Sequence, residues 1–188
     1  MKNTKKVLAL VLAVVMVLAL SVSAFADAPT KNDSITVNNA KAGETYNLYK
    51  LFDLVVNDET NPTAYSYTIN SAWADFFKAA EDDTPAGAGL QYVTINEAGY
   101  VTAISDAAAL AKAAVNWSGK PAATQSVTVG EGETTAVFTG LTDGYYVISS
   151  TLGTIAMAET TPDKAAVTIN EKNPEDTIEK NVKEDSGD

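Results

Sequence analysis

Tyr46-Asn47-Leu48-Tyr49-Lys50-Leu51-Phe52-Asp53-Leu54-Val55-Val56 is the longest strand-like segment of this 188-residue chain. Its apolar residues recur at every second position, which is the period of a β-strand. Strict alternation places on one face the side chains of Tyr46, Leu48, Phe52, Leu54 and Val56. It also places Lys50 on that face, where an isolated ammonium group must reach solvent, pair with an acid or react.

Shorter segments with the same period lie on both sides, separated by turn signals such as Asp143-Gly144. Glu97-Ala98 joins two of these segments as a hairpin. The predicted strands are residues 34–38, 46–56, 65–69, 90–96, 99–104, 125–129, 134–138, 145–150, 154–158 and 165–170. This succession of short strands predicts a mainly β protein with an immunoglobulin-like β-sandwich fold.

Two short helical insertions interrupt the predicted strands. Ser71 is a candidate N-cap for the first, and Ser105 is a candidate N-cap for an alanine-rich second helix that ends near Trp117. The first helix carries the aromatic residues Trp73, Phe76 and Phe77. We expect both helices to lie across a sheet with their aromatic side chains in the core.

The first 26 residues have the layout of a secretory signal peptide. Lys2, Lys5 and Lys6 form a basic start, residues 7–20 are apolar, and Ala24-Phe25-Ala26 is a small-x-small cleavage site. The apolar run is shorter than the roughly 20 residues of a stable membrane span. We expect cleavage after Ala26, and the alternative is an uncleaved N-terminal anchor.

The exported part is strongly acidic: it carries ten lysines, no arginine and 24 acidic residues, a net charge of −14. A field of this sign opposes binding to nucleic acid and docking on an anionic membrane. The chain also has no Cys and no His. Disulfides, Ser-His-Asp and Cys-His catalysis and ordinary zinc sites are therefore excluded, and we expect no cofactor.

The chain changes character after its last predicted strand. Residues 170–176 are polar and contain Pro174, and residues 177–182 alternate like a new strand with nothing to pair with. We predict a signal peptide at 1–26, one domain at 27–171, a linker at 172–176 and the start of a truncated second domain at 177–188. The alternative is a disordered tail.

Three segments resemble the N-terminal domain of sortase-assembled pilins of Gram-positive bacteria. Residues 35–46 with Tyr49-Lys50-Leu51-Phe52 resemble that family's first strands. Residues 137–148 contain Leu141-Thr142-Asp143-Gly144-Tyr145-Tyr146, which is similar to its Leu-x-x-Gly-Tyr-Tyr turn and strand. Residues 167–173 followed by 177–182 resemble the junction into a second pilin domain.

The resemblance implies a structural shaft subunit, secreted and held at the cell wall in a pilus, that is not an enzyme. In this family a class C sortase forms a thioester with the C-terminal sorting signal of one subunit, and a lysine of the next subunit attacks it. The family motif ends in Tyr-Pro-Lys-Asn; here Glu171-Lys172-Asn173 stands at that place, with Asn170-Glu171 instead of Tyr-Pro. Lys172 is therefore the candidate acceptor, with Asn173 beside it.

The resemblance also implies intramolecular isopeptide bonds between a lysine and an Asn or Asp. Lys180 resembles the first-strand lysine of a following domain, whose partners would lie beyond residue 188. Lys50 is a weaker candidate in the present domain. The family module places an acid after its Gly-x-Tyr strand, and this chain has Ser149-Ser150-Thr151 there. We therefore expect Lys50 to remain unbonded.

Two other functions remain open. The first is a non-polymerising secreted or wall-attached adhesin, since the same scaffold carries ligand-binding modules and host surface ligands are possible partners beside other pilin subunits. The second is an enzyme that uses carboxylates alone, but Asp82-Asp83 beside Thr84-Pro85 favour a solvated loop. The chain has no Leu-Pro-x-Thr-Gly sorting signal, from which we expect it to be a fragment of a longer protein.

Overall fold

The computed structural model describes residues 26–27, 32–58, 62–81 and 85–171, and this part of the chain is mainly β. The strands are β1 (Ala26–Asp27), β2 (Asp33–Asn38), β3 (Thr45–Val56), β4 (Tyr65–Ile69), β5 (Val93–Ile95), β6 (Tyr100–Ile104), β7 (Gln125–Thr128), β8 (Thr135–Leu141), β9 (Gly144–Ser150), β10 (Ile155–Thr160) and β11 (Ala166–Asn170). The helical elements are η1 (Ser71–Trp73), α2 (Ala74–Phe77), η2 (Leu90–Tyr92) and α3 (Ala107–Asn116).

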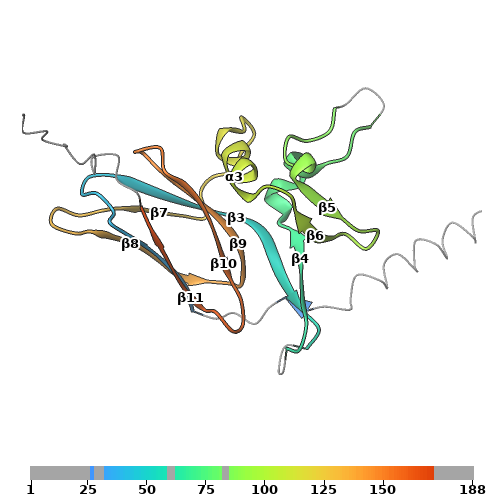
Figure 1. Cartoon of the computed structure of the whole chain (residues 1–188), viewed down its shortest axis with the longest axis horizontal. Helices are drawn as coiled ribbons and strands as arrows, with labels where there is room; N and C mark the ends of the chain where they lie inside the picture. Colours follow the sequence, from blue (N-terminus) through green and yellow to red (C-terminus); the bar gives the residue numbers. More distant parts are fainter. Residues whose placement is uncertain (1–25, 28–31, 59–61, 82–84, 172–188) are drawn as a thin grey trace, which may run out of the picture.

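The strands form two sheets. The larger has the order β10-β9-β3-β4-β6-β5, and β1 and β7 also pair with β3. The smaller has the order β11-β2-β8, in which β11 runs parallel to β2 and β8 antiparallel to it. Figure 1 shows that one end of the long strand β3 lies among strands β7–β11 and that its other end lies beside β4. The last described strand, β11, therefore pairs with β2, which lies near the N-terminal end of the described chain.

The first hydrophobic core lies between the two sheets. It joins residues of the smaller sheet to residues of the larger one, and its members include Ile35, Val37, Phe138, Tyr46, Leu48, Tyr146 and Ile148. The second core lies on the other face of β3. There Tyr49, Leu51 and Phe52 pack with the aromatic residues of η1 and α2 and with Leu110 of α3. The aromatics of the first helical segment are therefore buried as predicted. Helix α3 buries Leu110, Ala111 and Ala114 instead, and Trp117 at its end is partly buried.

Strand β3 does not alternate strictly along its length. Its first half pairs with β7 at one edge through residues 45–48, and its second half pairs with β4 through residues 52–56. Near this change of partner the consecutive residues Leu51 and Phe52 both belong to the second core. The prediction that Phe52 shares a face with Tyr46 and Leu48 is therefore wrong.

Each predicted strand is found, but only Tyr65–Ile69 keeps both of its predicted bounds. The larger shifts are at the start of β5 and at the ends of β8 and β10. Residues 90–92 form the helical turn η2, and only residues 93–95 form a strand. Both N-caps lie one residue away from the predicted serines. Asn70, just before Ser71, accepts from the Ala72 N–H, and Asp106, just after Ser105, accepts from the Ala109 N–H at 2.9 Å. The amide oxygen of Asn70 and the carboxylate of Asp106 cap these helices as well as a serine would.

The two faces of β8 give a direct test of the core between the sheets. Phe138 is fully buried and its neighbour Val137 is 44 % exposed. We expect Phe138→Ala to lower the free energy of unfolding by about 3–5 kcal/mol, because it removes a buried ring and leaves a cavity. Val137→Ala should change it by about 0.5 kcal/mol. Urea denaturation of both variants checks this, and equal effects would contradict the assignment of β8's inner face.

Candidate functional site

The last described residue, Glu171, lies at the end of β11 with 3 % of its surface exposed. Its backbone N–H donates to the Asn38 carbonyl at 3.0 Å, so the pairing with β2 continues to this point. Val167 in β11 and Glu171 just after this strand are both buried, and Ile169 between them is partly buried. Alternation therefore directs the Glu171 carboxylate inward, between the two sheets.

Three hydroxyl groups surround this carboxylate. Tyr46 of β3 donates to Oε2, and Ser150 of β9 donates to Oε1 at 3.2 Å. Thr154, in the turn between β9 and β10, also donates to Oε1. Burial and the hydrogen bond to Glu171 raise the pKa of Tyr46 to about 12, so its phenol stays a neutral donor.

The arrangement joins the end of the smaller sheet to two strands of the larger one. A buried carboxylate is costly unless its oxygens accept hydrogen bonds, and here both oxygens do. Glu171, the last described residue, is therefore held by both sheets. The sequence prediction treated Glu171 as part of a solvated boundary; the inward period of Val167 and Ile169 was the signal that could have shown its burial.

Replacing Glu171 tests how much this cluster stabilises the domain. We expect Glu171→Ala to lower the free energy of unfolding by about 2–3 kcal/mol, because three hydroxyl donors lose a charged acceptor. Glu131→Ala, on an exposed turn, is the matched control and should have an effect within about 0.5 kcal/mol. The measurement is urea denaturation, and an effect of Glu171→Ala as small as the control's would show that the cluster adds no stability.

The acceptor and second-domain residues predicted from the sequence lie outside the described part of the chain. This holds for Lys172, Asn173 and Lys180, whose predicted roles stay predictions. What the structure supplies is the position of the residue to which Lys172 is bonded. Glu171 stands at the end of β11, next to Asn38 and beneath the hydroxyl of Tyr46.

Lys50 lies where β3 changes partner, and it is paired. Its Nζ lies 2.8 Å from Oδ1 of Asp53, and the side chain of Lys50 is 13 % exposed. The same Nζ donates to the Thr142 hydroxyl at 2.5 Å and lies 5.8 Å from the centre of the Tyr146 ring. An inward lysine can reach solvent, pair with an acid or react, and this geometry favours pairing with the acid Asp53.

Two buried aspartates lie in the same part of the core, and the sequence analysis missed them. Asp33 is fully buried at the start of β2, and within the described residues neither of its oxygens has a hydrogen-bond partner. Asp143, buried as well, is held in the turn between Thr142 and Gly144. Burial is the main cause that raises the pKa of Tyr146 to about 12, and the charges of Asp33 and Asp53 add to it.

The ion pair gives a testable form to the expectation that Lys50 remains a free amine. We expect the intact mass of the purified, processed protein to equal that of the unmodified chain. An amide to an Asn would remove one ammonia, and an amide to an Asp one water. Lys50→Met serves as the control, because it cannot form either bond. A mass deficit that is present in the wild type and absent in Lys50→Met would contradict the expectation.

Within the described ranges, no group of three or more Asp or Glu side chains is arranged to hold a metal ion, and no helix is long and apolar enough to cross a membrane. No protein-family model matches the chain, and no curated protein is similar enough to count as a relative.

Proposed function

We propose that residues 27–171 are the N-terminal domain of a structural, non-enzymatic pilus subunit that sortase polymerises covalently on the surface of a Gram-positive cell. The observation that carries the proposal is the buried end of β11. Glu171 is held by hydroxyls of both β3 and β9, and the next residue along the chain is the lysine that resembles the family's acceptor. Lys172 therefore follows a fixed anchor.

An immunoglobulin-like sandwich is the fold that we propose for this domain. Two sheets with a shared core support it. The hydroxyl of Tyr146, near the start of β9, also donates back to the backbone carbonyl of Thr142. A tyrosine that bonds to the backbone a few residues upstream is a recurrent corner of immunoglobulin-like domains. Here the corner coincides with the segment that resembles the pilin turn.

The acceptor chemistry needs only an amine that reaches the enzyme. In the proposed step, Nζ of Lys172 attacks the thioester carbonyl between sortase and the sorting signal of another subunit. An amide bond forms, the carbon–sulfur bond breaks, the sortase thiol leaves and the amine loses a proton. The chain needs no imidazole or thiol of its own for this step, which agrees with the absence of His and Cys.

The proposed junction also accounts for an unbonded Lys50. If Lys172 carries the bond between subunits, tension runs from Lys172 towards the C-terminal part of the natural protein. Residues 27–171 then lie outside the part of the chain that bears the tension, and they need no internal covalent bond to resist it. The ion pair between Lys50 and Asp53 is sufficient for a domain in this position.

The test is transfer of a donor to this chain by a class C sortase. A donor subunit with a Leu-Pro-x-Thr-Gly signal should form one covalent adduct with residues 27–188, and mass spectrometry should place the new amide on Lys172. Lys172→Ala should abolish the adduct, because it removes the amine. Lys164→Ala is the matched control, since Lys164 is an exposed lysine nearby in sequence, and it should react like the wild type.

Two results would count against the proposal. An adduct that persists in Lys172→Ala would show that another lysine is the acceptor. The absence of any adduct, with a sortase that joins known pilins in the same assay, would favour the alternative of a non-polymerising adhesin.

A further inference from the structure

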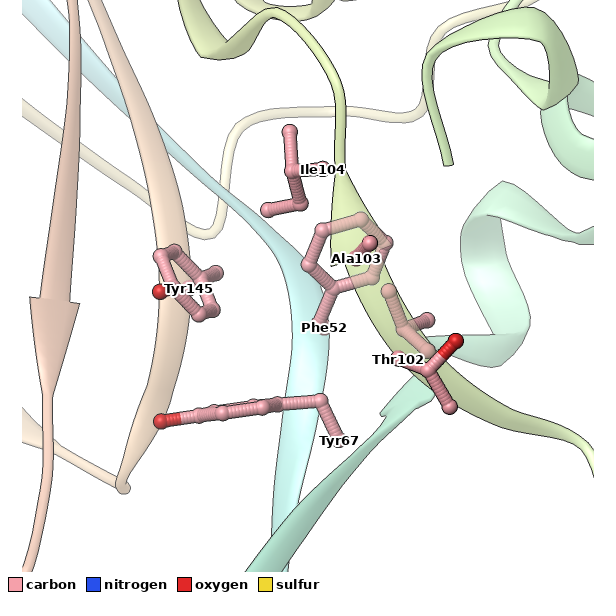
Figure 2. A pocket seen from close by; sticks show the side chains of 7 residues that line it. Phe52, Tyr67, Thr102, Ala103, Ile104 and Tyr145 are labelled. Atoms are coloured by element: carbon pink, nitrogen blue, oxygen red, sulfur yellow. The ribbon is translucent and has the colours of Figure 1, made fainter. Parts of the chain in front are cut away.

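A cavity of about 300 Å³ opens on the side of the larger sheet, away from the end of β11. Figure 2 shows that Tyr67 of β4 and Tyr145 of β9 lie on one side and the residues of β6 on the other, with Phe52 between them. The lining residues are Phe52, Tyr67, Val101, Thr102, Ala103, Ile104 and Tyr145. The volume is within the range of small-molecule sites.

Aromatic rings form a continuous row along this cavity. The ring centres of Tyr67 and Tyr145 are 4.8 Å apart, and those of Phe52 and Tyr145 are 6.0 Å apart. The row continues outward to Tyr65, whose ring centre lies 6.2 Å from that of Tyr67 and which is 44 % exposed. Such rings present electron-rich faces, which attract cations.

A carboxylate lies at the hydroxyl end of the two tyrosines. The Tyr67 hydroxyl donates to Oε1 of Glu159 on β10. Burial, followed by the charge of Glu159, raises the pKa of Tyr145 to about 12. Burial and the hydrogen bond to Glu159 also raise the pKa of Tyr67. Both phenols therefore stay neutral, and the negative charge in this region is that of Glu159.

The rest of the cavity adds no positive charge. None of the lining residues is basic, and the chain as a whole has a net charge of −11. On the β6 side, pairing with β4 covers only Tyr100 and Val101. Thr102 and Ala103 of β6, which line the cavity, therefore have no pairing partner in the described part of β4.

We propose that this cavity binds a small organic cation of the quaternary ammonium type, held by the faces of Tyr67 and Tyr145 and by the nearby charge of Glu159. Its methyl groups pack against Phe52 and Ile104, and its charge lies over the rings. An anionic ligand would meet Glu159 without a compensating base. A sugar would need several polar side chains for its hydroxyls, and Thr102 is the single polar residue of the lining that is not a tyrosine.

The probe is choline chloride, titrated into residues 27–188 and followed by NMR chemical shifts. Neohexyl alcohol, the uncharged carbon isostere of choline, has the same shape and lacks the charge. Potassium chloride at the same concentration controls for ionic strength. We expect choline to bind at least about 10-fold more tightly than neohexyl alcohol, with the largest shifts at residues 101–104 and 145, because one or two ring contacts supply that difference.

Variants separate the rings from the charge. Tyr145→Leu should weaken choline binding at least about 10-fold, and Tyr145→Phe, which keeps the ring, should retain it. Glu159→Gln should weaken choline and leave neohexyl alcohol unchanged. Glu97→Gln, an exposed acid on the β5–β6 turn, controls for the lost net charge, and circular dichroism checks that each variant is folded.

Equal binding of choline and neohexyl alcohol would overturn the proposal, since the cavity would then be merely apolar. So would the absence of choline binding to the folded wild type, or a Tyr145→Leu variant that binds choline like the wild type. None of these outcomes bears on sortase transfer to Lys172, because the cavity includes neither Glu171 nor its hydroxyl partners.

Discussion

The structure depends on one strand that is buried on both faces. Strand β3 contributes Tyr46 and Leu48 to the core between the sheets and Tyr49, Leu51 and Phe52 to the core beneath the helices. At one edge it pairs first with β7 and then with β4. Two cores and four neighbouring strands share β3, so this strand connects the two parts of the described structure.

Two polar contacts of the interior lie where this strand begins and where it changes partner. Tyr46, at its start, reaches Glu171, and Lys50, at the change of partner, reaches Asp53 and Thr142. Buried charges are expensive unless each has partners. Asp53 lies on β3 itself, whereas Glu171 and Thr142 lie outside this strand, so these two contacts also fix how β3 meets its neighbours.

Much of the fold could be predicted from the sequence because its strands are short and their apolar period is clear. Residues 65–69 form β4 as predicted, and the aromatic residues of the first helix are buried. Strict alternation failed at Phe52, since the break in period comes from the change of pairing partner, a long-range feature. The N-caps moved by one residue because Asn70 and Asp106 supply equivalent oxygens.

The candidate sites were less predictable for a related reason. The burial of Glu171 was readable from the period of Val167 and Ile169, but its hydroxyl partners come from residues up to 125 positions away. The aromatic cavity draws Tyr67, Val101 and Tyr145 from separate strands, and no local pattern joins them. The proposed acceptor role of Lys172, by contrast, rests on a motif alone, and the structure adds only the buried residue that precedes it, Glu171.

The ends of β3 also set where the two ends of the domain lie. Ala26 pairs with Val56 at the last residue of β3, whereas Glu171 binds Tyr46 near the first. Ten residues of extended chain separate those two positions, a distance of about 33 Å. A peptide or enzyme genetically fused ahead of Asp27 would therefore be displayed about this distance from Glu171. In the filament that we propose, such cargo would not crowd the place where subunits are joined.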